Sequence, residues 1–358
     1  MTEARRKEES MKAVRYHSYG GSDVLVYEEA DRPIPDVGQV VVQVAGTSYN
    51  DADAGLRAGF RQDIVPVALP HIPNVDMAGV ITEVGEGVTG WSVGDAVIAV
   101  LPVTAPGAAA EYVAAPAEIL ASAPRTVELA DAAALPLVGL TAWQSLFEHA
   151  GLEPGQDVLI NGAGSAVGGY AVQLAVQAGA TVTATASPRS RDRIRAYGAQ
   201  RIIDYTETSV VQAVAGQQFG VVLNLAPNSP EENMELANLV ADGGAYVSTT
   251  PPVPQDVGRG VRAVRPFAYS DAAQLAALVA RVDAGDLEIA VTERLPLSEL
   301  PTVHARATER IAHVAELAAR VEGRELGFEV AAQLRAEADT VDVRAAGGEI
   351  VGKVILTP

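Results

Sequence analysis

The chain has 358 residues, 48% of them hydrophobic, and carries 45 acidic against 26 basic side chains, a formal net charge of −19. This acidity argues against nucleic acid or an anionic membrane surface as a partner, because the electrostatic term would be repulsive. The absence of cysteine excludes disulfides, thiolate zinc ligands and a cysteine nucleophile, and it suits a cytoplasmic protein. The length favours two domains, and no apolar run approaches the length of a membrane span.

Short strands separated by turns are predicted from residue 12 to about residue 127. Apolar or alternating runs at 40–44, 79–84 and 96–100 indicate strands, with glycines and prolines between them. The charged residues 1–10 lack the apolar segment of a signal peptide and are expected to form a disordered extension. This part of the chain is therefore predicted to be an irregular β-rich domain.

Strands and helices alternate from about residue 128 to residue 267. We expect strands at 158–161, 181–186, 201–204, 220–225 and 244–249, and helices at 131–149, 167–178, 189–197, 207–215 and 231–241. Such alternation predicts an α/β domain whose parallel sheet has helices on both faces. Beyond it we expect a helix at 272–284, a strand at 287–291, a helix starting at 297 and a closing strand at 350–356.

A glycine-rich turn joins the strand at 158–161 to the following helix. Gly162 and Gly164 fit a dinucleotide-binding fingerprint, in which the strict third glycine is replaced by Val167, with Gly168 next to it. Such a turn places a pyrophosphate at a helix N-terminus, although it can also serve packing alone. The residues expected to bind the cofactor phosphates are Gly162, Ala163, Gly164, Ala166 and Val167.

The residues after the second strand of this domain favour NADPH over NADH. Ala186 stands where an enzyme that uses NAD carries an acidic residue for the ribose diol. Three arginines follow within Ser187–Arg193, and guanidinium groups suit a 2′-phosphate. The alternative is a solvated helix face that Asp192 partly neutralises.

Several ordered segments resemble one family. Among them are Gly46-Thr-Ser-Tyr-Asn-Asp51, Pro73-Asn-Val-Asp-Met-Ala-Gly79, Ala134-Leu-Pro-Leu-Val-Gly-Leu-Thr-Ala-Trp143, the turn at 161–168 and Ile203-Asp-Tyr205. The chain resembles the medium-chain dehydrogenase/reductase superfamily, in its zinc-free quinone oxidoreductase (zeta-crystallin-like) branch. The resemblance implies a GroES-like catalytic domain at 1–127 and 268–358 and a Rossmann NADPH-binding domain at 128–267.

The resemblance also bears on metal. Zinc alcohol dehydrogenases of this superfamily supply a cysteine after the third strand and a Gly-His-Glu segment further on. Here the corresponding segments read Ser48-Tyr49-Asn50-Asp51 and Asn74-Val75-Asp76. His71 is nearby, but it lacks a thiolate or a second histidine at ligand spacing and is expected on a polar loop. No catalytic metal is expected.

Further site residues follow from the resemblance. It implies that Ser187, Arg191 and Tyr205 contact the 2′-phosphate, with Arg189 beside them, and that Thr141 contacts the nicotinamide end or the phosphates. It also implies that Ser48, Tyr49 and Asp51 line the nicotinamide side of the cleft between the domains, although Ser48 replaces a common asparagine. Tyr49 could donate a proton or pack between domains, Asp51 could be a helix N-cap, and solvent could supply the proton instead.

The implied function is hydride transfer from NADPH to a quinone or an α,β-unsaturated carbonyl, both small molecules. A dedicated enoyl reductase on one biosynthetic intermediate and a non-catalytic NADPH-binding protein are the alternatives. The segment 307–347 is longer than in relatives, which indicates a surface insertion, or else a lid or an added dimer contact. The resemblance implies a homodimer that pairs near Val261–Ala268.

Overall fold

The computed structural model describes residues 10–59, 62–63, 65–307 and 353–358. These residues form two compact units: the first holds residues 10–137, 270–307 and 353–358, and the second holds residues 138–269. The domain boundaries expected at 127/128 and 267/268 stay predictions. The expected extension at the N-terminus lies outside the described residues except for Ser10, and the insertion at 307–347 does so except for Ala307.

The first unit is built on strands that pair antiparallel, except that β14 runs parallel to β15. They are β1 (Ser10–Tyr16), β2 (Leu25–Asp31), β3 (Gln39–Ser48), β4 (Asp76–Val84), β5 (Ala96–Val100), β6 (Tyr112–Pro116), β7 (Ala121–Ser122), β14 (Val291–Pro296) and β15 (Lys353–Thr357). The main sheet has the order β14-β15-β3-β4-β5-β7, with β6 paired to β3, while β1 pairs with β2. The strands predicted at 40–44, 79–84 and 96–100 are confirmed as parts of β3, β4 and β5.

Short helices complete this unit. They are η1 (Ser22–Val24), α2 (Asp51–Arg57), η2 (Ala117–Ile119), η3 (Asp131–Ala134), α8 (Ala272–Asp283), η5 (Leu297–Glu299) and a helical stretch at 300–307. The last strand, β15, runs antiparallel to β3, with Ile355 opposite Ser48. This register brings the C-terminal end of the chain to the point where β3 leads into α2.

One strand of this unit begins later than predicted. We expected a strand at 287–291, but β14 starts only at Val291. Leu287 is buried, and its N–H donates to the carbonyl of Arg281 in the last turn of α8, at 3.1 Å. Leu287 therefore caps the C-terminal end of α8. Pairing with β15 begins only at Val291.

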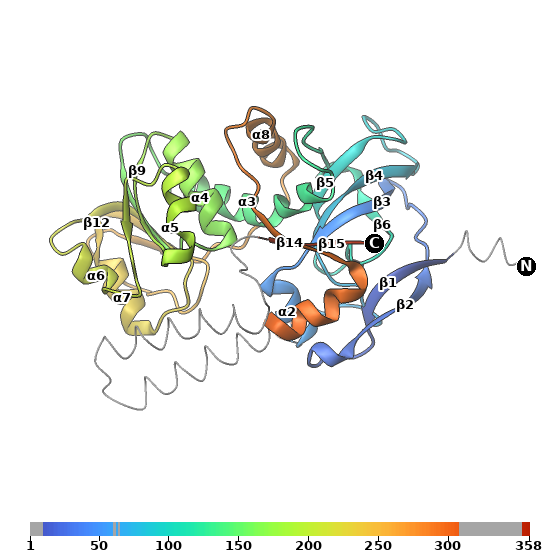
Figure 1. Cartoon of the computed structure of the whole chain (residues 1–358), viewed down its shortest axis with the longest axis horizontal. Coiled ribbons are helices and arrows are strands. Elements are labelled where there is room, and N and C mark those ends of the chain that lie inside the picture. The colour runs from blue at the N-terminus through green and yellow to red at the C-terminus, as the bar shows by residue number, and fades with distance from the viewer. Residues whose placement is uncertain (1–9, 60–61, 64, 308–352) are drawn as a thin grey trace, which may run out of the picture. The chain divides into compact units, whose positions relative to one another are not determined.

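The second unit holds a parallel sheet with the strand order β10-β9-β8-β11-β12-β13. Figure 1 labels its strands β9 and β12 among the helices α4 to α7. The strands are β8 (Asp157–Asn161), β9 (Thr181–Thr185), β10 (Arg201–Ile203), β11 (Phe219–Asn224), β12 (Val240–Ser248) and β13 (Arg262–Val264). This is the Rossmann order, which reverses between β8 and β11. The predicted α/β fold class is confirmed.

Helices connect these strands. They are α3 (Pro136–Trp143), whose first two residues lie in the first unit, η4 (Gln144–His149), α4 (Ala166–Gln177), α5 (Pro188–Ala196), α6 (Val210–Ala213) and α7 (Pro230–Asn238). Two helices are shorter than predicted: α6 keeps four residues of 207–215, and α7 ends before 241 because buried Val240 already pairs in β12. Within the described residues, we find no helix that combines the length and the apolar character needed to cross a bilayer.

Candidate functional site

The turn between β8 and α4, residues 162–168, is called the phosphate turn. Gly162 has φ +87°, a conformation that glycine adopts without steric cost. The hydroxyl of Ser165 donates to the carbonyl of Gly162 at 2.8 Å and accepts from the N–H of Gly168 at 3.1 Å. The first N–H groups of a helix lack partners within the helix and attract anions. The turn therefore leads into the N-terminus of α4, the end of a helix that attracts anions.

The structure assigns the third close-packing position of this turn to Gly168. A Cβ atom there would lie 2.4 Å from the carbonyl oxygen of Gly162 and 2.6 Å from the Cα of Ala163. Val167 occupies the third position of the strict sequence pattern. It is only half-buried, so this position accommodates a side chain. The third glycine of the fingerprint is therefore present, one residue later than in the strict pattern.

The arginines that follow β9 have different surroundings. The guanidinium of Arg191 contacts the carboxylate of Asp204 at 2.5 Å, and that carboxylate is buried. Arg193 donates to the carbonyl of Gly164 at 2.7 Å and so braces the phosphate turn, while Arg189 is half-buried near the start of α5. Ser187 is the N-cap residue of α5. Because β9 and β10 are adjacent parallel strands, Tyr205, just after β10, lies at the same edge of the sheet as Ser187.

Polar side chains at the carboxyl ends of the strands support the turn. Asn161 donates to the side-chain oxygen of Asn224 at 2.8 Å and accepts from the hydroxyl of Thr185 at 2.9 Å. The hydroxyl of Thr185 in turn accepts from the N–H of Gly162 at 2.8 Å, and Asn224 donates to the hydroxyl of Ser248 at 3.0 Å. This network was not predicted from the sequence. Its signal is the polar residue that ends each of the strands β8, β9, β11 and β12.

The first unit contains a buried group of polar side chains at the end of β3, called the polar cluster: Ser48, Asn50, Asp76 and Lys353. Asp76 is fully buried and accepts from the hydroxyl of Ser48 at 2.5 Å, from the side-chain amide of Asn50 at 2.9 Å and from the N–H of Leu137 at 2.7 Å. The ammonium of Lys353 lies 3.3 Å from the same carboxylate. The cluster therefore pairs a buried negative charge with a buried positive one.

Lys353 also holds the chain segment that carries the predicted catalytic residues. Its ammonium donates to the carbonyl of Tyr49 at 2.9 Å and to the side-chain oxygen of Asn50. No role was predicted from the sequence for Lys353, Asn50 or Asp76. Ser48 is predicted to face the nicotinamide. In the structure its hydroxyl donates a hydrogen bond to the carboxylate of Asp76.

Tyr49 and Asp51 lie together at the start of α2. The hydroxyl of Tyr49 donates to the carboxylate of Asp51 at 3.3 Å, and its ring meets the imidazole of His304 edge-on, with centroids 4.9 Å apart. Asp51 is exposed, and the N-cap of α2 is Asn50, which forms a capping box with Asp53. The reading of Asp51 as the N-cap was therefore wrong by one residue. Thr141, the remaining predicted contact, lies in α3 and is half-buried.

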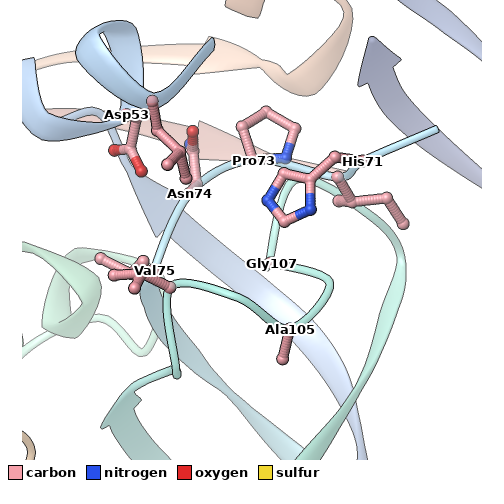
Figure 2. A pocket seen from close by; sticks show the side chains of 10 residues that line it. Asp53, His71, Pro73, Asn74, Val75, Ala105 and Gly107 are labelled. Carbon is pink, nitrogen blue, oxygen red and sulfur yellow. The ribbon is translucent and has the colours of Figure 1, made fainter. Parts of the chain in front are cut away.

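A small pocket lies beside α2 in the first unit and is called the α2 pocket (Figure 2). The residues that line it are Asp53, Leu56, His71, Ile72, Pro73, Asn74, Val75, Val103, Ala105 and Gly107. Burial lowers the pKa of His71 to about 4, so its imidazole is neutral at physiological pH. The expectation that His71 lies on a polar loop was wrong, because it is buried and packs against the ring of Tyr16.

Asp53, on the other side of this pocket, has a perturbed carboxyl group. Burial and the nearby charge of Asp76 raise its pKa to about 7, although the charge of Lys353 acts in the opposite direction. Both protonation states of Asp53 are therefore populated near neutral pH. In the described part of the chain, no group of three or more His, Cys, Asp or Glu side chains is arranged to hold a metal ion.

Comparison with known proteins agrees with this geometry. The alcohol dehydrogenase GroES-like domain family matches residues 36–125, and the zinc-binding dehydrogenase family matches residues 197–312. The chloroplast envelope quinone oxidoreductase homolog of Arabidopsis thaliana is 35% identical over 249 residues, which cover 67% of this chain and 75% of that protein. The NADPH-dependent alkenal/one oxidoreductase of the same plant is 37% identical over 212 residues, 56% of this chain and 54% of that protein.

Solved structures share the fold. The quinone oxidoreductase from Coxiella burnetii superposes with a TM-score of 0.77 at 24% identity, covering 98% of this chain and 99% of that one. The strand order of the second unit, the glycine turn after β8 and the sequence relatives all indicate the same family. The chain is an oxidoreductase that belongs to the quinone oxidoreductase branch of the medium-chain dehydrogenase/reductase superfamily.

Proposed function

We propose that this protein is a zinc-independent reductase that transfers a hydride from NADPH to a quinone or an α,β-unsaturated carbonyl compound. The observation that carries the proposal is the phosphate turn, braced by Arg193 and followed by Arg189 and Arg191 at the start of α5. The names of relatives, which include quinone oxidoreductases and an alkenal/one oxidoreductase, support the acceptor class.

The residues of the second unit fit a nicotinamide dinucleotide with a 2′-phosphate. A Cβ atom at Gly164 would lie 2.7 Å from the hydroxyl of Ser190, so a side chain there would require Ser190 to move. Asp204 fixes one nitrogen of Arg191, and a guanidinium keeps further N–H donors for an anion. We assign the 2′-phosphate to Ser187, Arg189, Arg191 and Tyr205, and the remaining contacts to Thr141 and the phosphate turn.

When bound, NADPH supplies the hydride. We assign Tyr49, Ser48 and Asp51 to the substrate side: Asp51 orients the hydroxyl of Tyr49, and Ser48 holds the carboxylate of Asp76 in place. Tyr49 or solvent then delivers the proton that completes the reduction. Within the same proposal, the protein is cytoplasmic and forms a homodimer through the edge strand β13.

The test is oxidation of NADPH and NADH by the purified protein with a quinone, a 2-alkenal, a cyclic enone and an enoyl thioester as acceptors. We expect NADPH to be preferred and the Arg191→Gln variant to raise the KM for NADPH about tenfold or more, because a charge-assisted hydrogen bond is lost. The KM for NADH should change little.

Arg195→Gln is the matched control. Arg195 lies on the same helix, is 62% exposed and pairs only loosely with Asp192, at 3.2 Å. Its variant should keep the wild-type KM for both cofactors. Equal use of NADH and NADPH by the wild-type protein would contradict the cofactor assignment, and no oxidation with any acceptor would contradict the reductase.

A further inference from the structure

Thr185 is the last residue of β9, and its hydroxyl reaches the first residue of the phosphate turn. The residue is 1% exposed. Its hydroxyl oxygen accepts from the N–H of Gly162 at 2.8 Å, and the hydroxyl donates to the side-chain oxygen of Asn161 at 2.9 Å. A hydroxyl has one proton to donate and two lone pairs. The bond to Asn161 uses the proton, so Gly162 is met by a lone pair.

Asn161 is itself held in a fixed orientation. It is 6% exposed, and its side-chain nitrogen donates to the side-chain oxygen of Asn224 at 2.8 Å, so its own side-chain oxygen is left to face Thr185. Asn224 is fully buried and donates to the hydroxyl of Ser248 at 3.0 Å. Because each group in this series has a defined role as donor or acceptor, the hydroxyl of Thr185 has one orientation in the folded protein.

The peptide unit between Asn161 and Gly162 is fixed at both ends. Its carbonyl oxygen accepts from the N–H of Leu225 at 2.8 Å, and its N–H is the group that donates to Thr185. The backbone pairing of β8 with β9 ends one residue earlier, where Ile160 lies opposite Ala184. The hydroxyl of Thr185 therefore takes the place of a backbone acceptor at the point where the chain leaves the sheet.

The other N–H groups of the phosphate turn fall into two sets. Those of Ser165 and Gly168 donate within the turn, to the carbonyl of Gly162 at 3.1 Å and to the hydroxyl of Ser165 at 3.1 Å. Within the residues that the structure describes, the remaining N–H groups have no acceptor: Ala163, Gly164, Ala166 and Val167. Anions at the start of a helix are bound by N–H groups of this second set. Their directions follow from the backbone that the first set and Thr185 hold in place.

We propose that Thr185 is a positioning residue for the cofactor: its hydroxyl fixes the peptide unit that enters the phosphate turn, and the affinity of the turn for a pyrophosphate depends on this bond. The inference rests on the proposed use of NADPH and adds a residue that acts through the backbone of Gly162. The same strand end leads into Ser187 and Arg191, which are assigned to the 2′-phosphate. The two phosphate sites are distinguished by ligands that carry one group without the other.

The first test is binding of NADPH and of 2′-AMP to the purified full chain, measured by isothermal titration calorimetry. NADPH carries a pyrophosphate and a 2′-phosphate, whereas 2′-AMP carries the 2′-phosphate alone. Thr185→Val and Thr185→Ala remove the hydroxyl, and Thr185→Ser keeps it. Thr183→Val is the matched control, because Thr183 lies two residues earlier on β9, is 7% exposed and shares the face of the sheet that carries Thr185.

We expect Thr185→Val and Thr185→Ala to weaken NADPH binding about tenfold or more, because the N–H of Gly162 loses its acceptor. Thr185→Ser should stay within about threefold of the wild-type affinity, and Thr183→Val should bind NADPH as the wild-type protein does. The affinity for 2′-AMP should be the same in all of these proteins, since this ligand has no pyrophosphate.

The second test needs no ligand. Amide hydrogen exchange of the segment around Gly162 should be about tenfold faster in the variants without the hydroxyl than in the wild-type protein, and unchanged in Thr183→Val. Equal exchange in all of these proteins would show that the hydroxyl does not hold this peptide unit, and the inference would be overturned.

The binding results separate this inference from the proposed function. Wild-type affinity for NADPH in both hydroxyl-free variants would overturn the role of Thr185 and leave the cofactor assignment standing. A loss of 2′-AMP affinity as large as the loss of NADPH affinity would also overturn it, because the whole end of β9 would then be damaged. If the wild-type protein binds neither ligand, the proposed use of NADPH fails, and the inference fails with it.

Discussion

The phosphate turn and the polar cluster are built in opposite ways. The turn is one continuous stretch, residues 162–168, and what it offers a ligand is backbone N–H groups and the absence of side chains. The polar cluster consists of side chains, and its ion pair joins residues 277 positions apart. A site made of backbone is damaged by atoms that are added, whereas a site made of buried side chains is damaged by atoms that are removed.

The largest effect is expected from removing the ammonium of Lys353. The Lys353→Met variant leaves the carboxylate of Asp76 buried without its positive partner, and breaking a buried ion pair in this way costs about 3 to 5 kcal/mol. The measurement is the free energy of unfolding in urea at neutral pH.

The control for this prediction is the double variant Lys353→Met with Asp76→Asn, which also removes the negative charge. Since the uncompensated charge is the cause, the double variant should recover part of the lost stability, and the coupling energy should exceed about 1 kcal/mol. A single variant as stable as the wild-type protein would show that the pair does not hold this end of β3.

Asp53 gives the next effect, which depends on pH. Its pKa rises from 3.8 to about 7 on folding, so the folded state binds the proton more tightly than the unfolded chain. Stability from this group is therefore full below about pH 4 and is lost as the pH rises to about 7, by at most about 4 kcal/mol. The groups that face it are Asp76, Lys353 and Tyr16.

The measurement compares the free energy of unfolding of the wild-type protein and of Asp53→Asn at pH 5, 6, 7 and 8. The asparagine keeps an acceptor for the N–H of Asn50 but does not titrate. The wild-type protein should therefore lose stability relative to the variant across this range, by about 3 kcal/mol. Parallel curves would show that Asp53 titrates normally.

The same contrast explains what the sequence could predict. The phosphate turn was recognisable because its glycines are neighbours in the chain, and even the displaced third glycine, Gly168, stood next to its expected place. Strands were predicted well where a run of apolar residues is buried on both faces, as at 158–161. These features depend on residues close in sequence.

The polar cluster was not predictable in this way. Lys353 stands in a closing strand that sequence analysis identified, but its partner Asp76 follows only from the register of β15 against β3 and of β3 against β4. The buried amide of Asn74 gave no signal either, because its conformation and its lack of hydrogen bonds arise from packing against the segment around Gly107. Such sites require the tertiary structure.

The smallest effect is expected from adding one methyl group to the phosphate turn, with two adjacent glycines of α4 as a matched pair. In Gly168→Ala the new Cβ would lie 2.4 Å from the backbone oxygen of Gly162, so the turn must shift. In Gly169→Ala the nearest atom is the ring carbon Cε2 of Tyr197 at 3.4 Å, an ordinary contact. Alanine gains about 0.5 to 1 kcal/mol over glycine inside a helix in both variants.

The clash in Gly168→Ala costs about 1 to 3 kcal/mol, so we expect a net loss of about 1 kcal/mol in the free energy of unfolding, and no loss for Gly169→Ala. Urea unfolding measures both changes, and NADPH titration by fluorescence measures their effect on the turn. The turn must move only in the first variant, and NADPH affinity should therefore fall in Gly168→Ala alone. If both variants bind NADPH as the wild-type protein does, NADPH affinity does not depend on the close approach of α4 to Gly162. The claim that the backbone of the phosphate turn forms the binding site would then be wrong.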